Sequence, residues 1–106
     1  MNWKHLESID QLNTAVMESN QQTVVLFKHS TRCSVSVMVK RMLESQWSHG
    51  SNVTPYFLDL LNHREISNEI ASRFDIHHES PQVVVLKDGK AVHSASHNEI
   101  DQADFA

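Results

Sequence analysis

Residues 23–42 read TVVLFKHSTRCSVSVMVKRM, and this stretch determines how the rest of the chain is arranged. The apolar run at its start favours a strand over residues 23–28 that is buried on both faces. A polar turn follows and ends at Cys33, the only cysteine of the sequence. Apolar residues at helical spacing then predict a helix from Ser34 onward. The pattern therefore predicts a strand, a turn and a helix whose N-terminus carries a thiol.

The position of Cys33 favours a reactive thiolate. A helix N-terminus presents unpaired N–H groups and a partial positive charge, and both stabilise a thiolate relative to a thiol. Most free cysteines are small buried hydrophobes, but Cys33 lies between Arg32 and Ser34 and not on an apolar stripe. Ser36 stands where a dithiol enzyme has its second cysteine. An oxidised Cys33 is therefore either a mixed disulfide with another molecule or a sulfenic acid.

Polar residues around the thiol are candidates for supporting it. We expect Thr31, Arg32 and Ser36 to support the thiolate. Lys28 has two equal interpretations, a cation that stabilises the thiolate or a solvated surface charge. His29 is either a proton partner of Cys33 or a residue that ends the strand, and the sequence does not decide between them.

The rest of the chain alternates predicted strands and helices. The strands are expected at residues 3–6, 23–28, 55–60, 83–86 and 91–96. The helices are expected at residues 9–19 after the N-cap Ser8, at 34–47 with an end near His49 and Gly50, at 62–74 with Asn62 as N-cap, and at 98–105. Asp88 and Gly89 predict a hairpin turn. This order predicts a single α/β domain, residues 1–106, with a central mixed sheet flanked by helices.

Apolar periodicity also predicts which side chains are buried. In the helix after Cys33, the expected core residues are Val35, Val39, Met42 and Leu43, with Met38 flanking them. Met17, Met38 and Met42 are interpreted as core-filling residues.

Composition limits the class of protein. The 106 residues are 40% hydrophobic and 21% charged, which is typical of a globular chain. No apolar run is long enough to span a membrane, and the first residues lack an apolar signal region, so we expect a cytoplasmic protein without a membrane partner. A net charge of −4 argues against nucleic acid as the main partner. The eight histidines show no metal-ligand spacing, and we predict no metal site.

Ser80 and Pro81 directly precede a strongly apolar predicted strand. Proline removes a ladder hydrogen bond, so it belongs at the start of such a strand. The alternative is a cis bond that turns the backbone of Ser80 toward Cys33. Because only about 5–6% of X–Pro bonds are cis, the local sequence alone favours the first interpretation.

The order of these elements resembles the thioredoxin fold over the whole chain. Four segments are more specific and are similar to the monothiol bacilliredoxins: KHSTRC at 28–33, REISNEIA at 64–71, HESPQ at 78–82 and SH at 96–97. The family usually has Cys-Pro-Ile-Ser where this chain has Cys-Ser-Val-Ser, so a proline at the first helical position is absent. The resemblance implies that Pro81 is cis and faces Cys33.

The resemblance also implies a function. It implies a monothiol thiol–disulfide oxidoreductase that removes bacillithiol from mixed disulfides on proteins, with Cys33 as the nucleophile. Bacillithiol is then the exchanging thiol, bacillithiolated proteins are the partners, and no tightly bound cofactor is expected. Ser80, Pro81, His78 and Glu79 are expected to bind the thiol substrate, and His97 to pack near them. For His78 and Glu79, support of the loop before Pro81 is an equal alternative.

Three other functions remain open at this point. The first is an iron–sulfur carrier similar to the monothiol glutaredoxins, and the absence of glycine after Cys33 argues against it. The second is a binding module that keeps the fold without catalysis. The third is a thiol peroxidase, which would form a sulfenic acid at Cys33.

Overall fold

The structure is a computed structural model that describes residues 1–105. Within these residues, five strands form one sheet in the order β1-β3-β2-β4-β5. The strands are β1 (Lys4–His5), β2 (Thr23–His29), β3 (Val53–Asp59), β4 (Gln82–Lys87) and β5 (Lys90–Ser96). The helices are α1 (Ile9–Glu18), α2 (Ser34–Gln46), α3 (Arg64–Phe74) and three short 3-10 helices, η1 (Gly50–Asn52), η2 (His97–Glu99) and η3 (Gln102–Phe105). The predicted α/β class with a mixed sheet is confirmed.

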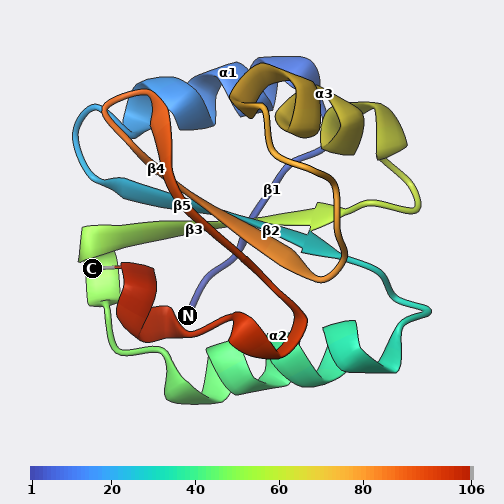
Figure 1. Ribbon diagram of the computed structural model, residues 1–106. Coiled ribbons are helices and arrows are strands. Elements are labelled where there is room, and N and C mark those ends of the chain that lie inside the picture. The colour runs from blue at the N-terminus through green and yellow to red at the C-terminus, as the bar shows by residue number, and fades with distance from the viewer. Residues whose placement is uncertain (106) are drawn as a thin grey trace.

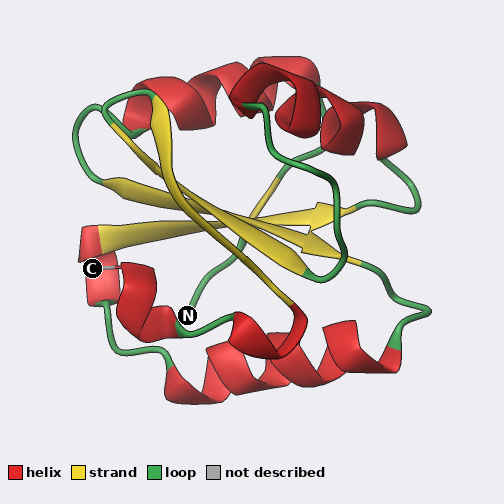
Figure 2. Cartoon of the chain, in the orientation of Figure 1, coloured by secondary structure: helices red, strands yellow, loops and turns green. Residues whose placement is uncertain are grey.

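The sheet lies between two helical layers. Helices α1 and α3 cover one face, and α2 covers the other face together with the C-terminal 3-10 helices (Figures 1 and 2). Strands β1, β3 and β2 are parallel, while β4 is antiparallel to β2 and β5 is antiparallel to β4. Successive side chains of a strand point to opposite faces. In β2, Val24 and Leu26 therefore pack on the α1 and α3 side, and Val25 and Phe27 pack on the α2 side.

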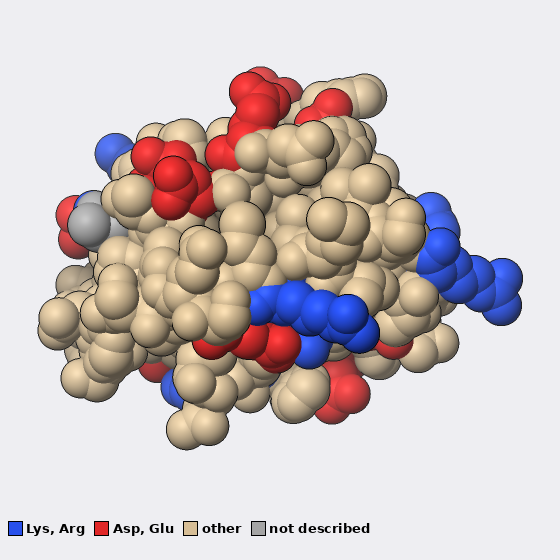
Figure 3. All heavy atoms as spheres, turned by 90° about the horizontal axis from the view of Figure 1, so that it is seen from below, with Lys and Arg blue, Asp and Glu red and all other residues tan. Residues whose placement is uncertain are grey.

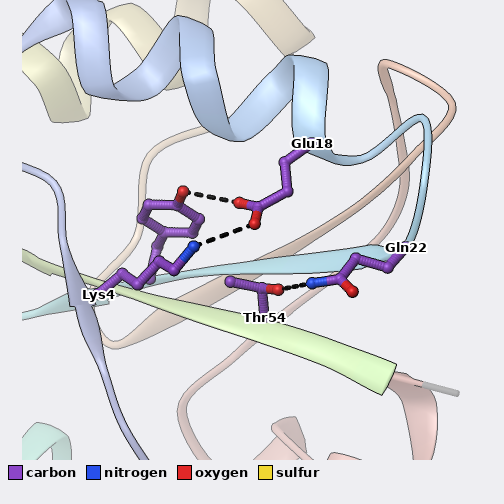
Figure 4. A network of polar contacts seen from close by, with 5 residues as sticks. Lys4, Glu18, Gln22 and Thr54 are labelled. Carbon is purple, nitrogen blue, oxygen red and sulfur yellow. Dashed lines mark hydrogen bonds and ion pairs between the residues drawn. The ribbon is translucent and has the colours of Figure 1, made fainter. Parts of the chain in front are cut away.

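The edge strand β1 is short, and side chains fix it to α1. Lys4 Nζ lies 3.0 Å from one carboxylate oxygen of Glu18, and the Tyr56 hydroxyl donates to the other oxygen at 2.7 Å (Figure 4). Gln22 Nε2 donates a hydrogen bond to Thr54 Oγ1 nearby. Burial, followed by the Glu18 carboxylate, raises the pKa of Tyr56. Glu18 therefore ties α1 to both β1 and β3.

Helix α2 reaches Trp47 as predicted, but the predicted cap at Gly50 and the predicted start of the next strand are wrong. Helix α2 ends at the C-cap Trp47, whose extended backbone stops it before Gly50. Gly50 does have a left-handed φ of 57°, but it uses this conformation in η1. Strand β3 starts at Val53, two residues earlier than predicted, because the parallel ladder with β2 already pairs Thr23 with Val53.

The N-cap of α3 is also different from the prediction. His63 occupies the cap position, and its side chain makes no capping hydrogen bond. Asn62 instead donates through Nδ2 to a carboxylate oxygen of Asp59 at 2.9 Å. Asparagine therefore stabilises the turn that leads into the helix and does not cap its first N–H groups.

The predicted C-terminal α-helix is replaced by η2 and η3, with an extended Ile100 after η2. Ile100 and Phe105 are both buried against the α2 side of the sheet. Five residues on a continuous α-helix turn the chain by about 500°, which would point these two side chains in different directions. The break allows both to reach the same core.

The buried stripe of α2 differs from the expected one. Ser36, Val39 and Leu43 are buried, whereas Val35 is 36% exposed and Met38 is 69% exposed. Met42 is half-buried, and Met17 on α1 is 71% exposed, so these methionines are not all core residues. The spacing 36, 39 and 43 is helical, but its first member is polar. The periodicity of apolar residues therefore did not predict this buried stripe.

Candidate functional site

Cys33 is the N-cap residue of α2. Its backbone is extended, with φ −106° and ψ 117°, and its carbonyl oxygen accepts the first helical hydrogen bond from the Val37 N–H at 3.1 Å. The Cys33 N–H donates to the Ser30 carbonyl at 3.2 Å and closes the turn after β2. The side chain makes no capping hydrogen bond and is partly exposed. The thiol therefore lies at the N-terminus of a thirteen-residue helix and is accessible to another molecule.

The Ser80–Pro81 bond lies at the same end of the sheet as the turn before Cys33. Strand β2 ends four residues before Cys33, and β4 begins directly after Pro81. The antiparallel register pairs Lys28 with Gln82, so the two segments meet where β2 ends and β4 begins (Figure 1). The Ser80–Pro81 bond is cis, as the resemblance implied.

Pro81 is fixed from the C-terminal side by His97. The His97 N–H donates to the Pro81 carbonyl at 3.0 Å, and His97 adopts a left-handed φ of 53° where η2 begins. The side chain of His97 is exposed. The structure therefore brings the backbone of His97 to Pro81, while its side chain faces outward.

Ser36 is bonded to the turn and to the end of β2. It is fully buried, its Oγ accepts from the Ser30 N–H at 3.1 Å, and the same oxygen lies 2.7 Å from Nδ1 of His29. Burial, followed by the charge of Lys40, lowers the pKa of His29, so its imidazole is neutral at pH 7. Ser36 thus connects the first turn of α2 to the strand that precedes Cys33.

Lys28 is buried on the opposite face of the sheet from α2. Its side chain has no exposed surface, although sequence reasoning placed it either beside the thiolate or in solvent. The ammonium Nζ lies 3.2 Å from the Ser67 carbonyl oxygen and 3.2 Å from Nδ1 of His78. Ser67 Oγ also lies 3.2 Å from this Nδ1 atom. Lys28 follows Val24 and Leu26 at alternate positions, and this was the signal that its side chain faces the core.

The protonation states of Lys28 and His78 determine which of them donates the hydrogen bond between them. Burial lowers the pKa of Lys28 from 10.5 to about 8, so the amine is still protonated at pH 7. Burial is also the largest cause of a lowered pKa at His78, with Lys28 the next. His78 is therefore neutral at pH 7, and its Nδ1 accepts a hydrogen bond from the ammonium group.

Gln82 provides a second contact to the same segment. Its Nε2 donates to the His77 carbonyl at 3.0 Å, and its side chain is 2% exposed. The Oε1 atom of Gln82 and the buried Oγ of Ser80 have no hydrogen-bond partner among residues 1–105. Sequence reasoning did not assign a role to Gln82.

Three other predicted site residues are not joined to Cys33. Thr31, Arg32 and Glu79 are exposed, and their side chains make no hydrogen bond or ion pair within the described part of the chain. On the surface seen from the α2 side, lysine and arginine side chains lie in separate groups, and most of the face is uncharged (Figure 3). The described residues contain no group of three His, Cys, Asp or Glu side chains placed to hold a metal ion. No helix within residues 1–105 has the length and apolar character needed to cross a membrane.

Comparison with known proteins identifies the family. Residues 4–105 match the family model described as "Monothiol bacilliredoxin BrxC". The chain belongs to the monothiol bacilliredoxin family. The predicted resemblance is therefore confirmed, and the family and fold support a role in thiol redox chemistry.

Solved structures similar to this bacilliredoxin share its fold. A protein described as having a thioredoxin fold is 27% identical with a TM-score of 0.81, over 93% of this chain and 86% of that one. The thioredoxin of Malassezia sympodialis is 20% identical with a TM-score of 0.76, over 97% and 84% of the two chains. Fasciola hepatica thioredoxin is 19% identical with a TM-score of 0.71, over 89% and 86%.

The segments that carry the bacilliredoxin resemblance are joined by direct contacts. Lys28 of the first segment contacts Ser67 of the second and His78 of the third. The carbonyl of Pro81, also in the third segment, is bonded to His97 of the fourth. Segments that are up to about seventy residues apart in the sequence thus form one connected unit at the end of the sheet that carries Cys33.

Proposed function

We propose that this bacilliredoxin removes bacillithiol from mixed disulfides on proteins by a monothiol mechanism in which Cys33 is the nucleophile. The observation that carries the proposal is the accessible thiol at the N-terminus of α2, with a buried serine where a resolving thiol would stand. The helix N-terminus stabilises the attacking thiolate. We place this activity in the cytoplasm, where protein thiols are kept reduced.

The reaction consists of two exchange steps. In the first, the Cys33 thiolate attacks the bacillithiol sulfur of a protein–bacillithiol disulfide. A bond forms between Cys33 Sγ and that sulfur, the original S–S bond breaks, and the protein leaves as a thiolate. In the second, the thiolate of another bacillithiol molecule attacks the bacillithiol sulfur on Cys33. Cys33 leaves as a thiolate, and bacillithiol disulfide is released, so that electrons and atoms balance.

Binding of the substrate is proposed to use the backbone of Ser80. Within residues 1–105 this backbone makes no hydrogen bond to another residue, so its N–H and C=O are available to an extended ligand. Such pairing resembles the addition of a short strand to a sheet edge. Pro81, His78 and Glu79 shape this part of the site, and the exposed Arg32 suits the malate carboxylates of bacillithiol.

The test is mass spectrometry of the intact protein after reaction with bacillithiol disulfide and, separately, with glutathione disulfide. We expect one bacillithiol adduct at Cys33, its removal by added bacillithiol, and slower reaction with glutathione disulfide. Cys33→Ser is the control and should form no adduct. A wild-type protein that forms no bacillithiol adduct, or that reacts equally with glutathione disulfide, would disprove the assignment to bacillithiol.

A further inference from the structure

A buried ammonium group joins the end of β2 to the segment between α3 and β4. Lys28 Nζ contacts the Ser67 carbonyl on α3 and Nδ1 of His78 in that segment, each at 3.2 Å. We propose that Lys28 is a positioning residue for substrate binding, because it holds the segment that presents Ser80 to the mixed disulfide. This inference rests on the proposed function and assigns to Lys28 a role that is separate from the reactivity of Cys33.

The surroundings of Lys28 favour a role other than packing. It shares its face of the sheet with the apolar core of Val24, Leu26 and Ile66. An aliphatic side chain would pack in such a place without the desolvation cost of an ammonium group. Lysine is instead placed with its charged end on two acceptors from two different elements, one on α3 and one in the following segment. The charged end is therefore used to join these elements.

A neighbouring residue holds the same segment from the next strand. Gln82 is the register partner of Lys28, and its Nε2 donates to the His77 carbonyl at 3.0 Å. The consecutive residues His77 and His78 are thus bonded to adjacent positions on β4 and β2. Only Glu79 separates His78 from Ser80, so a displacement of His78 is passed directly to the Ser80 backbone.

Lys28 is not placed to act on the thiol itself. Its side chain lies on the α1 and α3 side of the sheet, whereas α2, which carries Cys33 at its N-terminus, covers the other side. The described residues show no contact between Lys28 Nζ and Cys33. Removal of the ammonium group is therefore expected to weaken substrate binding and to leave the attack of Cys33 on a small electrophile unchanged.

The experiment compares Lys28→Met with Lys90→Met, which removes the same charge from an exposed position at the β4–β5 hairpin. For a bacillithiolated peptide, Lys28→Met should raise KM about tenfold with kcat changed by less than about threefold, the pattern of a lost binding interaction. The rate of Cys33 alkylation by iodoacetamide should stay within about twofold of wild type, because this reagent does not need the Ser80 backbone. Lys90→Met should match wild type in both assays.

Two further variants keep the test valid if Lys28→Met does not fold. His78→Asn keeps an acceptor close to the position of Nδ1, and His78→Leu removes it. We expect a KM near wild type for the first and a raised KM for the second. In a double variant, Lys28→Met and His78→Leu should together raise KM no more than either alone, because both remove one contact. Additive effects would overturn the proposal.

The remaining outcomes separate this inference from the proposed function. An unchanged KM in Lys28→Met, or a matching loss of alkylation rate, would show that Lys28 does not position the substrate. If wild type does not react with bacillithiol disulfide at all, the proposed function fails. In that case, the amide resonances of Ser80 and Gln82 in NMR spectra test whether Lys28 positions the Ser80 backbone. We expect Lys28→Met to shift them and Lys90→Met to leave them in place, and unshifted resonances in Lys28→Met would contradict it.

Discussion

Ser36 has a structural role that its place in the sequence does not indicate. The pattern Cys-x-x-Ser suggests a hydroxyl directed at the thiol, and we predicted that Ser36 supports the thiolate. The structure places its Oγ against the Ser30 N–H and His29 Nδ1, inside the core. With the proton of the neutral imidazole on Nε2, the Ser36 hydroxyl donates to His29. Support of the thiolate by Ser36 is then indirect, through the shape of the turn before Cys33.

Ser36→Ala is expected to destabilise the fold. The substitution leaves the partly buried Ser30 N–H and the buried His29 Nδ1 without their partner. An unpaired buried polar group costs about 1–3 kcal/mol. Urea unfolding measures the difference. Ser34→Ala, at an exposed position of the same helix, is the control and should change the free energy of unfolding by less than about 0.5 kcal/mol. Equal effects of the two substitutions would contradict the role assigned to Ser36.

Lys28 predicts a dependence of stability on alkaline pH. Burial lowers its pKa from 10.5 to about 8, so between these values the folded chain has lost a proton that the unfolded chain still binds. Stability from this group therefore rises with pH over that range, by at most about 3 kcal/mol. Urea unfolding across this pH range should show the rise in wild type and not in Lys28→Met.

The control for this prediction is Lys90→Met, in which the rise should persist because Lys28 is intact. If the free energy of unfolding changes with pH in the same way in wild type and in Lys28→Met, burial of the Lys28 ammonium group does not destabilise the fold. The same measurement tests whether Lys28 is kept for the contacts that it makes and not for the stability of the core.

At the scale of elements, α2 begins at Ser34, where the resemblance described above implied a proline directly after the cysteine. Ser34 is the first helical residue, it is exposed, and no residue within 1–105 accepts a hydrogen bond from its N–H. The preceding Cys33 has the extended backbone that a residue before proline requires. The position is thus compatible with proline even though the chain has serine there.

Ser34→Pro is therefore expected to stabilise the protein by about 0.4–1 kcal/mol, because proline restricts the unfolded chain and fits the first helical position. Thermal and urea unfolding measure the gain, and the rate of Cys33 alkylation shows whether the thiol is retained. Val37→Pro is the comparison, since it removes the hydrogen bond to the Cys33 carbonyl and should cost about 3 kcal/mol. A loss of stability in Ser34→Pro would be evidence that the start of α2 differs from the structure.

Most elements were predictable because their signals are local. The apolar run of β2, the Ser8 cap of α1 and the Asp88-Gly89 turn each depend on a few adjacent residues, and each lies where it was predicted. The end of the chain was not predictable in this way. Ile100 and Phe105 break the expected helix because both side chains pack into a core formed by distant residues.

The candidate site also has one part that local sequence predicted and one part that it did not. The placement of Cys33 at the start of α2 followed from the local pattern. Lys28 contacts Ser67, which is 39 positions further along the chain, and His78, which is 50 positions further. No pattern among adjacent residues predicts these two contacts. Alternation along β2 indicated the face that Lys28 occupies, but only the folded chain shows which acceptors its ammonium group meets.

At the scale of the whole molecule, two neutral imidazoles make the fold sensitive to acid. Burial is the largest cause of the lowered pKa values of His29 and His78. As the pH falls below the ordinary histidine value of about 6.5, the unfolded chain takes up protons that these folded residues do not yet bind. Stability present at neutral pH is therefore lost in this range.

Urea unfolding at neutral and mildly acidic pH tests this prediction. Wild type should lose stability on acidification, and His78→Asn should lose less because one of the two imidazoles is absent. His5→Asn, at an exposed histidine of β1, is the control and should lose as much as wild type. An equal loss in His78→Asn and His5→Asn would show that His78 does not contribute.

The buried serine of α2 has a consequence for how the oxidising equivalents leave the protein. A dithiol protein keeps them as an internal disulfide until a reductase docks on its surface. With Ser36 in this position, the proposed reaction transfers them to a small diffusible disulfide instead. The enzyme that completes the cycle then has to recognise only that small molecule. Under the proposed reaction, the surface around Cys33 does not have to bind a reductase and can be shaped by the mixed-disulfide substrates alone.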